Sequence, residues 1–167
     1  QGVEHITLNI RTKSFLSPKA FFALPRLRKI IEERQVHVIH AHTRVTQVMA
    51  CVLSRATACR YVSTCHGFYR RKIGRRIFPC WGEAVIAISP MVRDHAVHDH
   101  KVAQEKVHTV RNGVDIEQFM PASEQERQML RRELGLNSGK LIGMVSRLCA
   151  VKGHHVAVEA MSRIVQA

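Results

Sequence analysis

Short apolar runs alternate with longer amphipathic stretches along this chain. Four runs of β type begin near residues 36, 60, 84 and 107, so that each is separated from the next by about one strand–helix unit. We expect strands at residues 3–10, 36–40, 61–64, 84–88, 107–110 and 141–145. Because strands that alternate with helices form parallel sheets, the pattern predicts an α/β fold with helices on both faces of a parallel sheet.

The helices between these strands have recognisable start signals. Short polar side chains that can act as N-caps stand before four of them, at Ser17, Thr43, Ser89 and Ser123. Pro25 interrupts the first helix and should kink or restart it. A basic helical stretch is expected at residues 69–80, and a last helix from His154 onward. Because ligands of parallel sheets bind beyond the carboxyl ends of the strands, functional residues should follow the strands closely.

The segment Asn112-Gly113-Val114-Asp115 is predicted to mark a boundary between two domains. An Asn-Gly pair tolerates positive φ and therefore favours a tight reversal. The strand–helix series before it nearly completes itself, whereas the series after it has barely begun. We expect an N-terminal domain at residues 1–115, a linker at 116–122 and the start of a second domain at 123–167, in a chain that is a piece of a longer protein.

Net charge is the unusual bulk property of this sequence. The formal charge is +13, and no Asp or Glu occurs between Arg34 and Gly82. A field of one sign attracts polyanions such as nucleic acids, anionic membranes and phosphorylated substrates. The apolar runs are shorter than the roughly 20 residues of a membrane span. The five cysteines form no CxxC pair, which favours buried thiols in a reducing cytoplasm.

Arg147 and Lys152 are the first candidates for chemistry. Both lie between the strand expected at 141–145 and the last helix, where a helix N-terminus offers free N–H groups and a positive dipole end. A guanidinium and an ammonium group there would bind a diphosphate, and Gly143 would let a ligand approach the backbone closely. The alternative is that both cations simply point into solvent.

His66 and Gly67 are the second candidates, because they follow the strand expected at 61–64. A histidine at the carboxyl end of a strand is well placed to contact a ligand, and a hydrogen-bonded structural histidine is the alternative. His40 and His42 stand two residues apart in or beside a strand. We expect their rings not to share a metal, and we predict that the histidines of this chain ligate none.

A basic and aromatic segment follows Gly67. Its cations are Arg70, Arg71, Lys72, Arg75 and Arg76. Its apolar side chains are Phe68, Tyr69, Ile73, Ile77, Phe78 and Trp81. This mixture is typical of peripheral contact with an anionic membrane, and it also suits nucleic acid. The alternative is a solvated helix face above a stripe of core residues.

Five motifs occur in one order along the chain. They are Ile39-His40-Ala41-His42, Thr64-Cys65-His66-Gly67, Ala87-Ile88-Ser89, Asn112-Gly113-Val114-Asp115 followed by Phe119 and Pro121, and Arg147-Leu148 with Lys152-Gly153. Together they resemble the retaining glycosyltransferases of family four, over nearly the whole chain. That resemblance implies the GT-B fold, in which two Rossmann-like domains face each other across a cleft. The chain would then hold most of the acceptor-side domain, without its first strands, and the first strand–helix unit of the donor domain.

The resemblance also implies a role for each candidate residue. Arg147 and Lys152 would hold the donor diphosphate and stabilise the leaving nucleotide. His66 would contact the transferred sugar or its phosphate, with Gly67 and Gly143 beside the ligand. The partners would be a nucleotide-sugar donor and a saccharide or lipid-linked acceptor, with no metal, no other cofactor and no specific nucleic acid. The paired glutamates that grip the donor in this family would lie beyond Ala167, so we expect the isolated chain to be inactive.

The resulting hypothesis is a cytoplasmic enzyme, with peripheral contact to the inner face of the cytoplasmic membrane, that transfers a sugar with retention. Its acceptor would be a cell-surface polysaccharide, a lipopolysaccharide or a glycolipid. Two alternatives stay open at this point. One is a basic α/β module that binds nucleic acid, which the charge favours, although no RNP, helix-turn-helix or zinc pattern supports it. The other is a GT-B epimerase that acts on a sugar nucleotide.

Overall fold

The computed structural model describes residues 2–10, 12, 14, 17–136 and 139–166. The chain forms two units, one that ends at Val114 and one that begins at Asp115. The first unit contains a parallel sheet and its helices, and the second contains two helices joined by extended chain. Each unit is described separately below.

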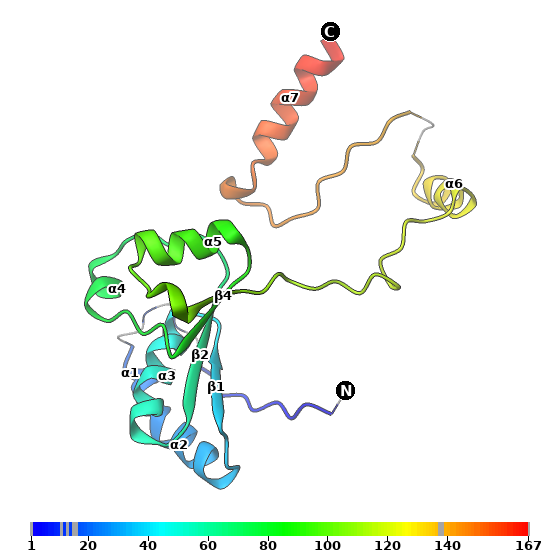
Figure 1. The fold of residues 1–167 in the computed structure, drawn as a ribbon. Helices are drawn as coiled ribbons and strands as arrows, with labels where there is room; N and C mark the ends of the chain where they lie inside the picture. The colour runs from blue at the N-terminus through cyan, green and yellow to red at the C-terminus, as the bar shows by residue number, and fades with distance from the viewer. Residues whose placement is uncertain (1, 11, 13, 15–16, 137–138, 167) are drawn as a thin grey trace. The chain divides into compact units, whose positions relative to one another are not determined.

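A four-stranded parallel sheet forms the centre of the first unit (Figure 1). Its strands are β1 (Val38–Ala41), β2 (Arg60–Cys65), β3 (Ala84–Ala87) and β4 (Val107–Thr109), and they lie side by side in that order. Ala41 pairs with Ser63 and Cys65 pairs with Ala87, so the carboxyl ends of neighbouring strands meet at one edge. The parallel α/β architecture predicted from the spacing of the apolar runs is confirmed.

The helices of the first unit begin close to the predicted residues. They are α1 (Pro18–Phe22), α2 (Leu24–Glu33), α3 (Arg44–Ala56), α4 (Ile73–Ile77), α5 (Pro90–Asp94), the π-helical turn η1 (His95–Asp99) and the 3₁₀ turn η2 (Gln104–Lys106). The Thr43 and Ser89 side chains accept N-cap hydrogen bonds, as expected from the sequence. Ser17 stands at the N-cap position of α1 without a side-chain cap bond, and the helix restarts at α2 around Pro25.

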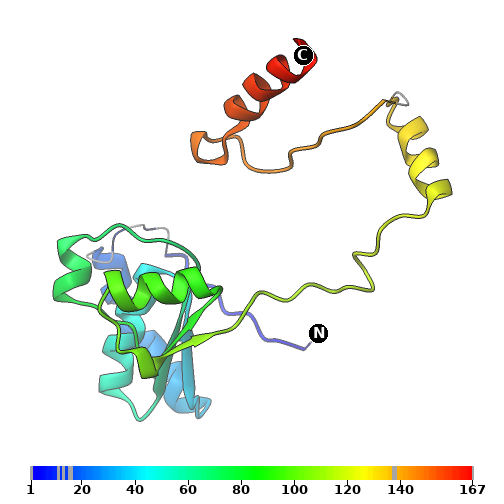
Figure 2. The ribbon, with the colours of Figure 1, turned by 45° about the horizontal axis from the view of Figure 1, so that its top comes forward.

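Helices α3 and α5 pack against the same face of the sheet, so the expected placement of helices on both faces does not hold for these two. Ala50 of α3 lies in a buried cluster with Ala41 and Tyr61. Val92 of α5 lies in a second buried cluster with Val85. The strand residues of both clusters share one face of the sheet through the register, because the side chains of a strand alternate between faces. Figure 2 shows these helices from a second direction.

The second unit contains α6 (Glu124–Glu133), the 3₁₀ turn η3 (Ala150–Lys152) and α7 (His154–Gln166). Ser123 and Glu126 form a reciprocal capping box at the start of α6. Gly135, with φ of 65°, follows the end of that helix in a left-handed conformation. The start of α7 agrees with the sequence, and Ala167 lies outside the described residues.

The strands predicted at residues 3–10 and 141–145 are wrong. Both segments lie outside regular secondary structure in the structure. A strand needs a neighbour that completes its backbone hydrogen bonds, and neither segment pairs with a strand in the described part of the chain. Both segments therefore have β-type sequence but lack the neighbouring strand that a β-strand requires.

The helix predicted at residues 69–80 is too long, since only α4 (Ile73–Ile77) is helical there. The guanidinium group of Arg44 binds the carbonyl oxygens of Gly74, Phe78 and Pro79. Pro79 has no N–H to continue a helix. Tertiary hydrogen bonds therefore replace helical ones in most of this segment.

The cysteines are all free thiols, as the sequence indicates. Cys59 and Cys65 are buried, and burial raises the pKa of both thiols. Cys51 and Cys80 are half-buried, and Cys149 is exposed. The expectation of buried thiols is therefore confirmed for Cys59 and Cys65 and wrong for Cys149.

Gly82 is the glycine whose replacement should cost most. Its φ is 92°, and a Cβ atom there would lie 2.6 Å from the carbonyl oxygen of Tyr61. That oxygen is held in place because it accepts a hydrogen bond from the N–H of Glu83 at 2.8 Å. We predict that Gly82→Ala lowers the free energy of unfolding by more than about 1 kcal/mol in urea titrations. Gly113→Ala, where a Cβ meets nothing within 4 Å, should stay within about 0.5 kcal/mol of wild type.

Candidate active site

Three histidines meet at the carboxyl edge of the sheet, and we call this group the histidine edge. His40 lies in β1, His42 directly follows β1, and His66 directly follows β2. The Nδ1 atom of His42 lies 2.9 Å from Nε2 of His66, and their rings stack with centroids 5.2 Å apart. A hydrogen bond between two ring nitrogens requires one donor and one acceptor, so one ring carries a proton at this contact and the other does not. The bond holds the two rings in a fixed orientation relative to each other.

His40 contacts both the sheet and the His42 ring. Its Nε2 atom lies 2.7 Å from the Thr64 hydroxyl, and its ring centroid lies 4.1 Å from that of His42. Burial lowers the pKa of His40, and the nearby His42 and His66 lower it further. The neutral imidazole is therefore favoured at His40, which keeps positive charge from accumulating in the group.

The expectation that the His40 and His42 rings point apart is wrong. Side chains two residues apart along extended chain lie on the same face, so alternation brings these two rings together, with their centroids 4.1 Å apart. In the part of the chain that the structure describes, no group of three or more His, Cys, Asp or Glu side chains has an arrangement that could hold a metal ion.

The loop after β2 presents His66 to solvent. The His66 side chain is exposed, and its backbone N–H donates to the Tyr69 hydroxyl at 3.2 Å. The Tyr69 N–H in turn donates to Nε2 of His95 at 2.9 Å, so the loop is tied to helical turn η1. A Cβ atom on Gly67 would meet nothing within 4 Å. Open space beside His66 is therefore available to a ligand.

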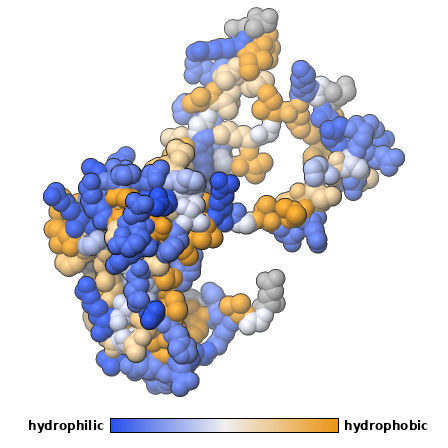
Figure 3. Space-filling view, in the orientation of Figure 1, coloured by the Kyte–Doolittle hydropathy of each residue, from blue (hydrophilic) through white to orange (hydrophobic). Residues whose placement is uncertain are grey.

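The basic and aromatic segment after Gly67 exposes its apolar side chains. The exposed fractions are 64% for Phe68, 77% for Ile73, 63% for Ile77 and 58% for Phe78. Trp81 differs, because it is only 6% exposed. The view that Ile73, Ile77 and Phe78 form a core stripe is therefore wrong. Figure 3 shows apolar and hydrophilic side chains side by side on the surface of this unit.

Arg147 and Lys152 lie in the second unit, in the loop before α7, and both are exposed. The loop ends at Gly153, whose φ of 69° turns the chain into the helix. The Ser146 hydroxyl lies 3.1 Å from Nε2 of His154, which ties the loop to the first turn of α7. A Cβ on Gly143 would meet nothing within 4 Å. Both cations thus precede α7 in the chain, and their role in binding a diphosphate stays a prediction.

The sequence points to His66 as a site residue but does not identify His42 as its partner. Both rings belong to the same edge because β1 and β2 are neighbours in the sheet. A signal is present in the sequence, since each histidine lies two residues beyond the end of a predicted strand. The order of the strands in the sheet decides which carboxyl ends are adjacent, and the sequence does not give that order.

Comparison with known proteins gives a consistent family. Residues 2–118 match the family model described as Glycosyltransferase Family 4. A mannosylfructose-phosphate synthase from Agrobacterium fabrum is 30% identical over 80 residues, which is 48% of this chain and 17% of that protein. A D-inositol 3-phosphate glycosyltransferase from Corynebacterium urealyticum is 29% identical over 148 residues, 77% of this chain and 34% of that protein. The chain thus spans about a third or less of the length of these relatives.

Solved structures resemble the chain over most of its length. A glycosyltransferase from Rickettsia africae superposes with a TM-score of 0.78 at 23% identity, covering 96% of this chain and 44% of that one. Anabaena Alr3699/HepE, solved in complex with UDP-glucose, superposes with a TM-score of 0.73 at 20% identity, covering 92% of this chain and 42% of that one. At these identities the likeness shows the fold, a partial GT-B arrangement of the Rossmann-like α/β class.

Proposed function

The chain belongs to Glycosyltransferase Family 4, and on this basis we propose that it is part of an enzyme that transfers a sugar from a nucleotide-sugar donor with retention of configuration. The observation that carries the proposal is the His42–His66 pair, which presents an exposed, oriented imidazole at the carboxyl edge of a parallel sheet. Ligands of such sheets bind at that edge. A nucleotide-sugar donor is also supported by the fold neighbour from Anabaena, which was solved with UDP and with UDP-glucose.

In the proposed reaction the bond between the sugar C1 and the diphosphate oxygen breaks, a bond from C1 to an acceptor hydroxyl oxygen forms, and the hydroxyl proton passes to the departing diphosphate. Negative charge develops on the departing diphosphate. Arg147 and Lys152 would stabilise that charge together with the N–H groups at the start of α7. His66 would contact the sugar or its phosphate and hold it in the reactive orientation.

The His66 imidazole should be required for turnover by the full-length enzyme. We predict that His66→Ala lowers kcat/KM for the nucleotide-sugar by about 100- to 1,000-fold, because a positioned polar contact at the reacting group is lost. The matched control is His98→Ala, since the His98 side chain is exposed and lies outside the histidine edge. Full activity in the His66 variant would remove this residue from the proposed site.

The loop before α7 should determine affinity for the diphosphate. In the full-length enzyme, Arg147→Ala combined with Lys152→Ala is expected to weaken UDP binding at least about tenfold, since charge-assisted hydrogen bonds contribute about 1.5–3 kcal/mol each. Isothermal titration calorimetry measures this directly. The control variant is Arg132→Ala with Lys140→Ala, which removes the same charge from the same unit. Unchanged affinity in the first variant would assign both cations to solvent.

We also propose that the acceptor is a polysaccharide, lipopolysaccharide or lipid-linked saccharide of the cell surface, reached at an anionic membrane. The described helices include none that is long and apolar enough to cross a bilayer. Peripheral contact is supported by residues 70–79, which include helix α4 and which we call the α4 segment. The exposed Ile73 and Ile77 stand there among Arg70, Arg71, Lys72, Arg75 and Arg76. Apolar side chains can enter the headgroup region while cations bind anionic lipid, each contributing about 1 kcal/mol.

Vesicle sedimentation tests the membrane proposal. We expect the 167-residue chain to sediment with vesicles that contain phosphatidylglycerol and to stay in solution with phosphatidylcholine alone. Ile73→Ser combined with Ile77→Ser should reduce binding by about tenfold, because buried apolar area is lost. Met129→Ser with Leu134→Ser, two exposed apolar residues of the second unit, is the control. Equal sedimentation with both kinds of vesicle would exclude an electrostatic membrane contact.

A further inference from the structure

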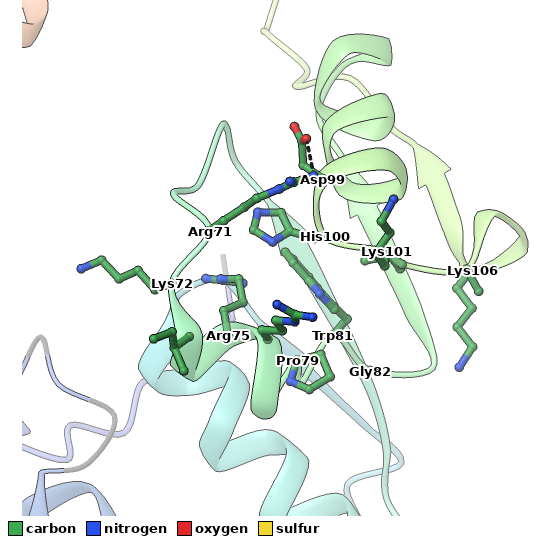
Figure 4. A pocket seen from close by; sticks show the side chains of 14 residues that line it. Arg71, Lys72, Arg75, Pro79, Trp81, Gly82, Asp99, His100, Lys101 and Lys106 are labelled. Carbon is green, nitrogen blue, oxygen red and sulfur yellow. Dashed lines mark hydrogen bonds and ion pairs between the residues drawn. The ribbon is translucent and has the colours of Figure 1, made fainter.

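A ligand-sized cavity lies away from the histidine edge (Figure 4). Its volume is about 800 Å³, and it lies between the α4 segment and the connection from η1 to β4. Trp81 and Gly82, which line it, precede β3, and Ala103 and Lys106 precede β4. The cavity therefore extends toward the amino ends of these strands, whereas His66 follows the carboxyl end of β2.

Positive charge is concentrated around this cavity. The cations that line it are Arg71, Lys72, Arg75, Arg76, Lys101 and Lys106. Asp99 is the one carboxylate of the lining, and it already accepts hydrogen bonds from Arg71 at 2.9 Å and from His95 at 2.6 Å. Within the described ranges, no ion pair involves the other lining cations, which are Lys72, Arg75, Arg76, Lys101 and Lys106. Mutual repulsion of these groups would be relieved by a bound anion.

Arg75 provides a fixed positive centre in this lining. Its guanidinium carbon lies 4.6 Å from the Tyr69 ring centroid and 4.7 Å from that of Trp81. Its Nη1 atom donates to the side-chain oxygen of Gln47 at 3.2 Å, and Gln47 is only 1% exposed. Burial lowers the pKa of Arg75, and the positive charge of Arg44 lowers it further. These contacts hold the guanidinium group in a partly buried position that disfavours its positive charge. A bound anion would offset this unfavourable energy.

Trp81 adds an unsatisfied hydrogen-bond donor to the same cavity. The side chain is 6% exposed, and among the described residues its indole Nε1 is the buried side-chain nitrogen or oxygen atom without a partner. The residue is anchored because its carbonyl oxygen accepts a hydrogen bond from the Ser63 hydroxyl at 2.5 Å. Buried donors in folded proteins are nearly always paired. An oxygen atom of a bound ligand that reached this N–H would supply the missing partner.

We propose that this cavity binds a ligand that carries a phosphate or diphosphate group, at a site separate from the histidine edge. Arg75 can grip phosphate oxygens in two parallel hydrogen bonds, and the lysines add mobile point charges. Figure 4 shows Arg75, Trp81 and His100 close together and the side chains of Lys72 and Lys106 extended away from them. Such lysines are free to swing onto a bound anion. The inference does not depend on sugar transfer, because neither His66 nor Arg147 lines the cavity.

Trp81 is the only tryptophan of the 167-residue chain, so its fluorescence reports on this cavity alone. We expect inorganic pyrophosphate, titrated at constant ionic strength, to change that fluorescence with a saturable response. Lys101→Gln combined with Lys106→Gln should weaken the response by about tenfold, because two charge-assisted contacts are lost. Lys19→Gln with Lys29→Gln is the matched control, with the same loss of charge in the same unit but outside the cavity.

Further measurements separate the possible sources of the phosphate and keep the test decisive. A response to free pyrophosphate identifies a soluble ligand, and a response only to phosphatidylcholine vesicles that contain phosphatidic acid identifies a lipid headgroup. Circular dichroism verifies that each variant is folded, and Lys72→Gln with Arg76→Gln replaces the first variant if that one unfolds. The Arg147→Ala, Lys152→Ala chain should keep the full response, which distinguishes this site from the donor site. No response to either probe, or equal weakening in the Lys19 and Lys29 control, overturns the proposal.

Discussion

Each strand of this protein exists because a neighbour completes its backbone hydrogen bonds. β2 and β3 have a paired strand on both sides, and their buried residues form the centre of the core. Residues 3–10 and 141–145 have β-type sequence but pair with no described strand, and they remain extended chain. Pairing satisfies polar groups that could not otherwise be buried. It also decides which carboxyl ends are adjacent, and this places His42 against His66.

Side-chain donors take over where regular backbone pairing ends. Between β2 and β3 only the short helix α4 is regular. Arg44 binds carbonyl groups at the end of that helix, and Tyr61 donates to the Cys80 carbonyl at 2.5 Å. These bonds hold the segment against the sheet while Ile73 and Ile77 face outward. One set of anchors therefore produces both the exposed basic and apolar surface and one wall of the cationic cavity.

Tyr69 connects the histidine edge with the cationic cavity of the first unit. Its hydroxyl accepts the His66 N–H, its own N–H donates to His95, and its ring lies against the guanidinium of Arg75. His95 in turn bonds Asp99 at 2.6 Å, on the rim of the cavity. The histidine edge and the cavity thus share a rigid, hydrogen-bonded support, although they lie toward opposite ends of the strands and present different chemistry. An imidazole group faces solvent at one, and clustered cations surround the other.

The sequence by itself determined the class of fold, the capped starts of α3, α5 and α6, and the ordered motifs that identify the family. These features depend on local periodicity, on single capping side chains and on residues close together in the chain. Only the tertiary structure decided that residues 3–10 form no strand, that Ile73 and Ile77 are exposed, and that His42 contacts His66. The same holds for the cavity around Arg75, whose lining comes from segments about 30 residues apart. Such outcomes depend on which neighbour supplies a hydrogen bond or covers a side chain, and composition and spacing along one chain do not specify that neighbour.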